Sequence, residues 1–287
     1  MSAITGDKKG VAFIEEIEMD RVFLFLVGTA PLIMHRFSAK AKREFLFPSG
    51  RKNAQERAET MKHDPLVEYQ ECFYRNRLYP NSPALFHIPS GAFEKAIAQA
   101  AIDIPGAFKA QIERLTSVVS RQIDFYGLPT MSAEMVRDAS IKRTPDIRFR
   151  PVFNQWACAI EIEFKRDPLT QRQIANLVNA AGKIVGVGDS RPEKGGGSIL
   201  GKCGKWRIAG ENDPELKEIM ANQARAPQQN AYDRPTAYDE ETEELLAWFE
   251  QEVLRRKNRP SVAKPSKKTG GKHGPAITLE GVDGTFA

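Results

Sequence analysis

The sequence predicts an α+β protein whose core is an antiparallel sheet with helices on one of its faces. Strand-like and helix-like segments follow one another in the order strand, helix, strand, strand, helix, strand. The strand-like segments are short and rich in β-branched and aromatic residues, whereas both helical segments carry apolar residues at helical spacing. This order is that of the split βαβ, ferredoxin-like fold, which RNA-recognition domains share, here with large insertions.

The first predicted strand lies within residues 11–28, where the continuous apolar run VFLFLVG begins at Val22. Such a run is typical of a central strand that is buried on both faces. The aromatic motifs with which RNA-recognition domains stack bases are not evident in either central strand. Contacts with nucleic acid are therefore expected from loops rather than from the sheet.

Residues 37–87 are predicted to be a helical insertion, because prolines divide them into short segments. A basic helix is expected from Ser38 to Phe47, and another over 64–74 with Asp64 as N-cap and Pro65 at the first helical position. The segment also carries an aromatic cluster, which is expected to pack beneath it or, alternatively, to offer stacking faces to bases. The cluster consists of Tyr69, Phe73, Tyr74 and Tyr79.

The next elements are a helix pair and a strand. The helix SGAFEKAIAQAAI begins at Ser90, which with Glu94 nearly forms a capping box, and its apolar residues share one face. A second helical pattern, AFKAQIERLTSVV, follows Pro105, and RQIDFYG reads as a strand that Gly127 ends. Residues 131–150 are polar and basic, which indicates a β-hairpin or an extended loop.

The second half of the predicted fold repeats the pattern of strand, helix and strand. FNQWACAIEIEF alternates apolar and acidic residues, as a half-buried strand does. Thr170 introduces the helix LTQRQIANLVNAAG, for which Gly182 is the expected C-cap. KWRIA then reads as the last strand.

The composition changes after Gly210, and four parts of the chain are expected. Residues 11–210 form the main domain, and the polar residues 211–236 read as a linker. Residues 237–257 form a helix with an acidic start and a basic end, which either docks a subunit or lies on the main domain. Residues 258–287 are rich in Lys, Gly and Pro and are expected to be a disordered basic tail.

Composition restricts the class of protein. The chain has 287 residues, a net charge of +5 and a pI of about 9.0, which suits a polyanionic partner. Its cysteines, Cys72, Cys158 and Cys203, are far apart in sequence, which favours a reducing compartment and argues against a structural zinc site. No apolar run has the length of a membrane span, and no signal peptide is evident, so a soluble cytoplasmic protein is expected.

Glycines and cations alternate between Ala181 and Arg207, in the stretch AGKIVGVGDSRPEKGGGSILGKCGKWR. Exposed N–H groups of a glycine-rich loop form anion-binding concavities, and nearby cations suit phosphate. A flexible, solvated hairpin is the alternative. Residues 196–203 read GxxxxGKC, but Cys203 replaces the Ser or Thr of a P-loop, and a strand rather than a helix follows. The dinucleotide-like pattern that starts at Gly186 has Arg191 where the third glycine belongs.

The candidate nucleic-acid contacts come from this stretch, from the basic segment 137–150 and from the residues after the first strand. They are Arg36, Lys40, Arg137, Lys142, Arg143, Arg148, Lys183, Gly186, Gly188, Arg191, Lys194, Gly195, Gly196, Gly197 and Lys202. Phe149 and Trp156 lie near the basic segment and could add base stacking. The alternative for that segment is a solvated basic face.

Catalytic chemistry has less support in the sequence. No Ser–His–Asp order, carboxylate pair or metal-ligand spacing is evident, and no cofactor or metal is expected. His35 follows the first strand beside Arg36 and is the candidate for acid–base catalysis of phosphoryl chemistry. His63 and His87 show no evident partners. Asp189 is either a metal ligand or a residue that closes a turn through its side chain.

Three segments together resemble the RAMP superfamily, the CRISPR-associated repeat-associated proteins. They are GTAPLIMHRFS after the first strand, the helix entry HIPSGAFEKAIAQAA, and the glycine-rich VGVGDSRPEKGGGS, and they span about 20–210. The chain is also similar to RAMP-like proteins encoded in phages and prophages. The resemblance implies a ferredoxin-like fold with insertions, binding of single-stranded RNA, and oligomerisation along a guide RNA as in backbone subunits. Some members are endoribonucleases that use a histidine. The long, Pro-containing glycine-rich loop and the basic tail depart from the family pattern.

These observations predict a non-enzymatic protein that binds single-stranded nucleic acid and forms a homo-oligomer or a nucleoprotein complex in a bacterial or phage-infected cell. RNA is the expected ligand by resemblance, and a phage protein that binds single-stranded DNA is the nearest alternative. Two other functions remain open. One is a metal-independent endoribonuclease centred on His35, and the other is a purely structural assembly protein.

Overall fold

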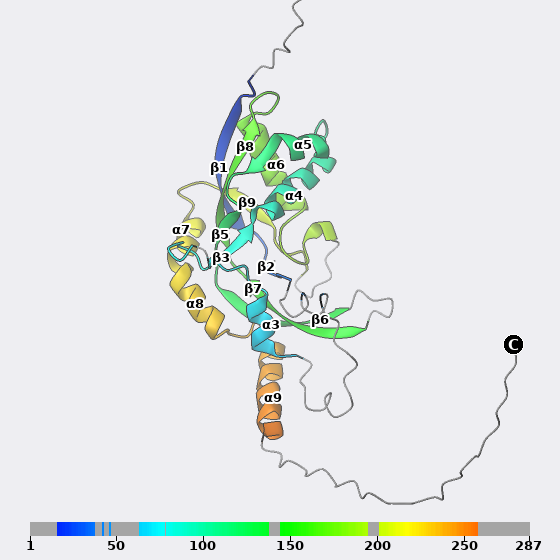
Figure 1. Ribbon diagram of the computed structural model, residues 1–287, viewed down its shortest axis with the longest axis vertical. Coiled ribbons are helices and arrows are strands. Elements are labelled where there is room, and N and C mark those ends of the chain that lie inside the picture. Colours follow the sequence, from blue (N-terminus) through cyan, green and yellow to red (C-terminus); the bar gives the residue numbers. More distant parts are fainter. Residues whose placement is uncertain are drawn as a thin grey trace, which may run out of the picture. The chain divides into compact units, whose positions relative to one another are not determined.

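The computed structural model describes residues 16–37, 63–77, 79–137, 144–194 and 201–257, together with the single positions 42 and 46. The chain divides into two compact units, residues 1–247 and 248–287. The first unit is an α+β arrangement of helices and two antiparallel sheets (Figure 1), which confirms the predicted class. The predicted basic helix at 38–47 and the predicted tail at 258–287 lie outside the described residues, apart from the two single positions.

The larger sheet has the strand order β3–β5–β8–β1–β9, with β4 also pairing with β8. Each pair of neighbours is antiparallel. The central strands β1 and β8 pair along most of their length, with Val22 opposite Ile162. The two strands that the sequence predicted from VFLFLVG and FNQWACAIEIEF are therefore neighbours in the sheet. The strands are β1 (Met19–Gly28), β3 (Phe86–Pro89), β4 (Thr116–Val118), β5 (Gln122–Tyr126), β8 (Ala157–Lys165) and β9 (Trp206–Ala209).

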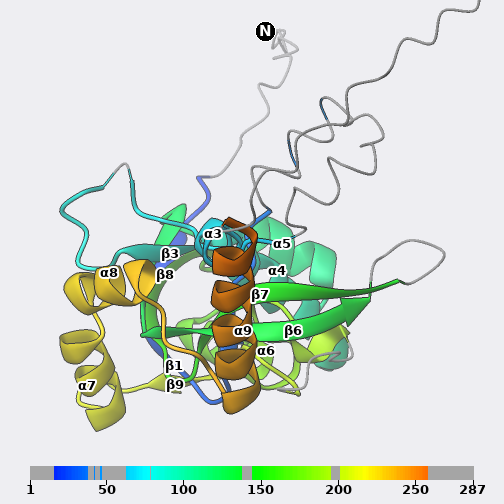
Figure 2. The same cartoon turned by 90° about the horizontal axis from the view of Figure 1, so that it is seen from below.

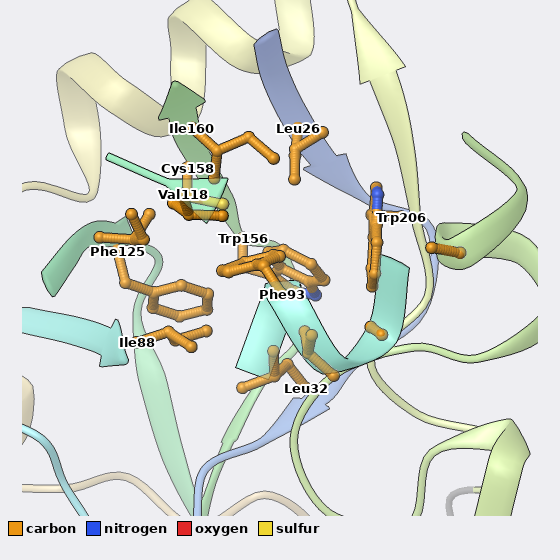
Figure 3. Packing of buried hydrophobic residues seen from close by; sticks show 14 of the residues in the cluster. Leu26, Leu32, Ile88, Phe93, Val118, Phe125, Trp156, Cys158, Ile160 and Trp206 are labelled. Atoms are coloured by element: carbon orange, nitrogen blue, oxygen red, sulfur yellow. The ribbon is translucent and has the colours of Figure 1, made fainter. Parts of the chain in front are cut away.

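The main core lies between this sheet and two helices that pack against each other, α4 (Ser90–Ala100) and α6 (Gln171–Ile184). Alternate residues of β8, from Cys158 to Phe164, are buried on this face because successive side chains of a strand point to opposite faces. Figure 3 shows Ile160 and Leu26 of the sheet in the same cluster as Phe93 of α4. Apolar burial of this kind is the main favourable term in folding.

Two further helices lie on the other side of the sheet (Figure 2), where the sequence predicted a linker. They are α7 (Pro214–Asn222), which contacts β1 and β8, and α8 (Arg225–Asp233). Leu216 and Ile219 are buried against Val27, and they are spaced as one face of a helix requires. The linker prediction for 211–236 is thus wrong, because a few apolar residues at helical spacing are sufficient to anchor an otherwise polar segment.

The other half of this second face is open, contrary to the expectation that β1 is buried on both faces. Phe23 is 58% exposed and contacts Phe25 edge to face at 5.1 Å between ring centroids. Arg21 pairs with Glu163 at 2.8 Å and with Glu161 at 3.4 Å on the same face. The apolar run alone did not show that α7 covers only the last residues of the strand.

The smaller sheet has the order β2–β7–β6, with β2 (Leu32–Ile33), β6 (Pro129–Arg137) and β7 (Pro145–Phe153). The strands β6 and β7 pair as a hairpin, which resolves the choice that the sequence left open for 131–150. The helix α3 (Pro65–Glu71) contacts β7 and has Asp64 as its N-cap, as predicted. His63, for which the sequence showed no partner, has two in the structure. Its ring nitrogens lie 2.6 Å from Glu68 and 3.0 Å from Asp146.

Several predicted helix ends differ in the structure. Pro89 rather than Ser90 is the N-cap of α4, and Glu94 instead accepts a hydrogen bond from the backbone N–H of Val118 in β4. The second helix, α5 (Lys109–Leu115), follows the short 3-10 turn η1 (Ala101–Asp103) and ends before β4. Gly182 lies inside α6, where a side chain would clash with Trp206.

The helix α9 (Glu240–Lys257) begins in the first unit and ends in the second. In the first unit, Leu245 and Leu246 pack against the core, and the buried Thr242 accepts a hydrogen bond from the N–H of Ala133. In the second unit, Glu252 pairs with two arginines one turn further along the helix. None of the described helices is long and apolar enough to cross a membrane.

Candidate nucleic-acid interface

A cleft of about 650 Å³ lies between the helices α4 and α5 and the segment 185–194, and we name it the glycine-loop cleft. The segment includes Gly186, Gly188 and the short 3-10 turn η2 (Pro192–Lys194). Residues that follow β1, among them Leu32, Met34 and His35, also line the cleft. Three parts of the chain that are far apart in sequence therefore meet at one surface.

The two glycines hold this segment in place by allowing close backbone packing. Gly186 has φ +76° and ends α6, and its N–H donates to the carbonyl of Ala181. Gly188 has φ +80°, and a Cβ there would lie 2.7 Å from the carbonyl oxygen of Ile33. The N–H of Asp189 donates to that same carbonyl at 3.0 Å. The need for glycine at both positions is thus explained by contacts within the chain.

An ion-pair network joins this segment to the β6–β7 hairpin. Arg150 lies 2.9 Å from Asp189 and 3.4 Å from Glu134, and its side chain is only 12% exposed. His35 Nδ1 lies 3.4 Å from the same Asp189 carboxylate. The hydrogen bond from His35, together with the charge of Arg150, holds the pKa of Asp189 well below its usual value, although burial acts in the opposite direction.

Asp189 therefore anchors the loop through its side chain. Its Oδ1 also accepts a hydrogen bond from the N–H of Ser190, which closes the local turn, as one of the two alternatives predicted. Among the described residues, no group of three or more His, Cys, Asp or Glu side chains could hold a metal ion.

The cleft carries cations on both walls. Lys95 of α4, Lys109 of α5 and Lys194 form no ion pair within the part of the chain that the structure describes. Arg191 also lines the cleft, but it pairs with Glu193 at 2.8 Å. Glu113 of α5 and Glu193 also line the cleft, so its lining carries four Lys or Arg side chains and three Asp or Glu side chains. Since Asp189 also pairs with Arg150, a small excess of positive charge remains.

The first turn of α4 adds to this positive potential. Pro89, Gly91 and Ala92 line the cleft, and the helix has no side-chain cap. The first N–H groups of a helix have no intrahelical acceptors and carry a partial positive charge. The remaining wall includes the apolar or aromatic residues Val187 and Tyr74. A ligand with phosphates and flat apolar groups fits this combination.

The structure brings together only some of the residues that the sequence predicted. His35, Gly186, Gly188, Arg191 and Lys194 line the cleft. The exposed Lys183 lies in the last turn of α6, and the exposed Lys202 follows Gly201, but neither lines the cleft.

Other predicted contacts have structural partners instead. Arg36 donates to the carbonyl of Glu71 at 3.2 Å, and Arg148 pairs with Asp146 at 2.9 Å. Phe149 and Trp156 are buried, which excludes the alternative that they stack on bases. The following predicted sites lie outside the described residues: Lys40, Lys142, Arg143, Gly195, Gly196, Gly197 and the side chain of Arg137.

Lys95 and Lys109 were not predicted. Both lie on helices, far in sequence from the glycines, and exposed lysines are ordinary on a helix surface. One sequence signal was available. Lys95 and Gln99 are four residues apart, so they lie on the same face of α4, and both line the cleft. That signal acquires meaning only when the opposite wall is known.

The P-loop alternative is excluded by the residues after the glycines. Cys203 is buried, and the strand β9 follows it where a P-loop requires a helix. Gly204 has φ +69°, and its N–H donates to the carbonyl of Pro31 at 2.7 Å. This end of the glycine-rich stretch is therefore part of the packed body of the protein.

A scan against protein-family models and a search of curated proteins each find no match to this chain. Neither comparison assigns a function to the cleft.

Proposed function

We propose that this protein binds single-stranded nucleic acid, with a preference for RNA, along the glycine-loop cleft, and that it does so without catalysis. One observation carries the proposal: three lysines that form no ion pair within the described residues line the same cleft of about 650 Å³ as the part-exposed ring of Tyr74. Grooves that bind single strands combine cations that follow the phosphates with surfaces against which bases stack.

The two walls have different roles in this proposal. Lys95 and Lys109 on the helical wall and Lys194 on the loop wall neutralise successive phosphates. Each such contact releases counterions, so binding depends strongly on salt and little on sequence. The part-exposed Tyr74 supplies the apolar contact. The mild positive charge of the whole chain, +5, is consistent with a polyanionic ligand.

The topology supports the relation to the RAMP superfamily and its ferredoxin-like fold. Because β1 and β5 each pair antiparallel with β8, they are parallel and separated by one strand, with α4 between them in sequence. The strands β8 and β9 are related in the same way across β1, with α6 between them. Two such units describe the split βαβ arrangement. On this relation we base the preference for RNA over DNA and the proposed oligomerisation along the strand.

A second candidate function is a metal-independent endoribonuclease, and one observation favours it. His35 is 41% exposed at the cleft, and its Nδ1 lies 3.4 Å from the Asp189 carboxylate. A carboxylate in this position orients an imidazole and leaves Nε2 for proton transfer with a ribose hydroxyl. His35→Ala would then abolish cleavage of a labelled RNA in the absence of metal, whereas a binding protein shows no cleavage in either form.

The proposed function is tested by a salt titration of a fluorescent oligouridine. The double variant Lys95→Ala with Lys194→Ala removes one cation from each wall. Two lost phosphate contacts should reduce the slope of log K against log salt by about 1.4, at about 0.7 per contact for a single strand. The matched control is Lys183→Ala with Lys202→Ala, which makes the same change in charge at exposed lysines outside the cleft.

The outcomes separate the candidate functions. Equal slopes for both double variants would show that the strand does not bind in the cleft. Salt-dependent binding that is as strong for oligodeoxythymidine as for oligouridine would favour the alternative of a protein for single-stranded DNA. Absence of binding to any single strand would favour a purely structural assembly protein.

A further inference from the structure

A second cleft, of about 890 Å³, differs from the first in chemistry. Residues 79–82 and 120–122 line it, together with Asn76 and Asp124. We name it the polar cleft, because nearly all of these residues carry hydrogen-bonding side chains. We propose that it holds one base of the bound strand and selects bases with an exocyclic amino group, namely adenine, cytosine or guanine, over uracil. This inference rests on the proposed function.

The selectivity comes from the geometry of Asp124. Its Oδ1 accepts hydrogen bonds from Asn76 Nδ2 at 2.7 Å and from Ser82 Oγ at 2.6 Å. Its Oδ2 makes no hydrogen bond within the described part of the chain. Asn76 is itself only 2% exposed and also donates to the carbonyl of Ala84, so the carboxylate is held in a fixed orientation. One charged acceptor is thus left for a ligand.

An ionised carboxylate can only accept hydrogen bonds. Adenine, cytosine and guanine each present an amino group that can donate to Oδ2. Uracil presents a single N–H between two carbonyl oxygens, and these oxygens are repelled by the carboxylate. A site that is built to pair with a donor rejects a ligand that lacks it, because the polar group of the protein then stays unpaired.

The other parts of a nucleotide also find partners in the polar cleft. The ring of Tyr79 is 59% exposed and offers a face for stacking. The exposed Arg121 forms no ion pair within the described residues, so its guanidinium is available to a phosphate. An aromatic ring, an acceptor and a cation therefore meet in one cleft.

Two backbone contacts connect the walls of the polar cleft and the glycine-loop cleft. Pro89 lines the glycine-loop cleft and pairs across the sheet with Gln122, which lines the polar cleft. The N–H of Ser90 also donates to the carbonyl of Arg121 at 3.0 Å. Neighbouring strands of a sheet lie about 5 Å apart. Asp124 and the core residue Ile123 are neighbours in β5 and point to opposite faces of the sheet, so a nucleic-acid strand that occupies both clefts passes around the end of β3 at Pro89.

The inference is tested by comparing fluorescent oligocytidine, oligoadenosine and oligouridine at one salt concentration. The wild-type protein should bind the first two about tenfold more tightly than oligouridine, within the range of discrimination by a good base contact. Asp124→Asn keeps an oxygen for Asn76 and Ser82 but places an NH₂ donor where Oδ2 stood. This variant should lose the preference or favour uracil, whose carbonyl oxygens can accept that donor.

Two further variants complete the test. Tyr79→Ala should weaken binding of all three strands by about fivefold or more, because stacking tolerates any base. Phe108→Ala is the matched control, since Phe108 is 69% exposed and lines neither cleft, and it should change nothing. The comparison of strands on the wild-type protein needs no variant, so a folding defect in Asp124→Asn does not obstruct it.

The failure of this inference is distinct from failure of the proposed function. If oligouridine binds and depends on Lys95 and Lys194, the proposed function stands. A wild-type protein without preference among the three strands, or an unchanged preference in a folded Asp124→Asn, would then overturn the base-selective site alone. If no strand binds, both proposals are refuted.

Discussion

Gly204 and Gly201 provide a matched test of what the glycines of the loop are for. Both have positive φ, +69° and +76°, which L-residues rarely adopt. They differ in their surroundings. A Cβ at Gly204 would lie 1.7 Å from the carbonyl oxygen of Val187, whereas a Cβ at Gly201 would meet nothing within 4 Å. Substitution by Ala therefore separates the backbone conformation from the packing.

The expected losses of stability follow from these contacts. At position 201, an alanine in the left-handed backbone conformation lowers the free energy of unfolding by about 1–2 kcal/mol. The lower entropy of the unfolded chain partly offsets this loss, so a net loss of about 1 kcal/mol is expected. At position 204, the backbone must also move away from Val187. This movement weakens two hydrogen bonds, from Val187 N–H to Gly204 O at 3.0 Å and from Gly204 N–H to Pro31 O at 2.7 Å. With about 1–2 kcal/mol for each bond, Gly204→Ala should cost about 3–5 kcal/mol.

The measurement is urea denaturation of Gly201→Ala, Gly204→Ala and wild type without nucleic acid, with the midpoint and the slope fitted separately. Binding of oligouridine should be unchanged in Gly201→Ala. Equal losses of stability for the two variants would refute the packing argument. If Gly204→Ala were as stable as wild type but bound poorly, its glycine would serve the ligand rather than the fold.

Two other variants test the network and the buried amides. Because the pKa of Asp189 is depressed in the fold, its stabilising effect is fully present above its unfolded value of 3.8 and is lost as the pH falls below it. Asp189→Asn should therefore be less stable than wild type at pH 7, and the two stabilities should converge in acid. Denaturation at several pH values measures this difference. A difference in stability that does not change with pH would contradict the role of the charge. Gln228 is fully buried and bonds to the backbone of Leu85, Phe125 and Gly127. Gln228→Ala should lower the free energy of unfolding by about 3 kcal/mol or more, since three buried backbone groups lose their partner. A loss below about 1 kcal/mol in urea denaturation would show that this contact of α8 does not stabilise the rest of the protein.

The sequence predicted the elements whose signal is local. The alternation in ACAIEIEF identified β8, and the apolar spacing after Thr170 identified α6. The capping box that Thr170 forms with Gln173 was seen only in the structure. These patterns arise because one face of each element is buried and the other is not. The pairing of β1 with β8 followed from the order of the elements.

The sequence was less informative where burial depends on a distant segment. Residues 211–236 have a polar composition, and only packing on the sheet reveals Leu216 and Ile219 as anchors. Phe149 and Trp156, for which base stacking was one of two alternatives, lie in the core, whereas Tyr79 is exposed at the polar cleft. An aromatic residue has the same local pattern in both situations, so its neighbours in space decide its role.

The sequence by itself determined the α+β class, the central strands, the two core helices and the concentration of glycine and cations in one loop. These properties depend on periodicity and turn chemistry within a few residues. Only the tertiary structure decided which cations share a cleft, because Lys95, Lys109 and Lys194 come together from separate segments. It also decided that Asp189 binds Arg150 and His35, and that one oxygen of Asp124 has no hydrogen-bond partner among the described residues. Charge–charge contacts and hydrogen bonds require distances of a few ångströms, and those distances exist only once the chain has folded.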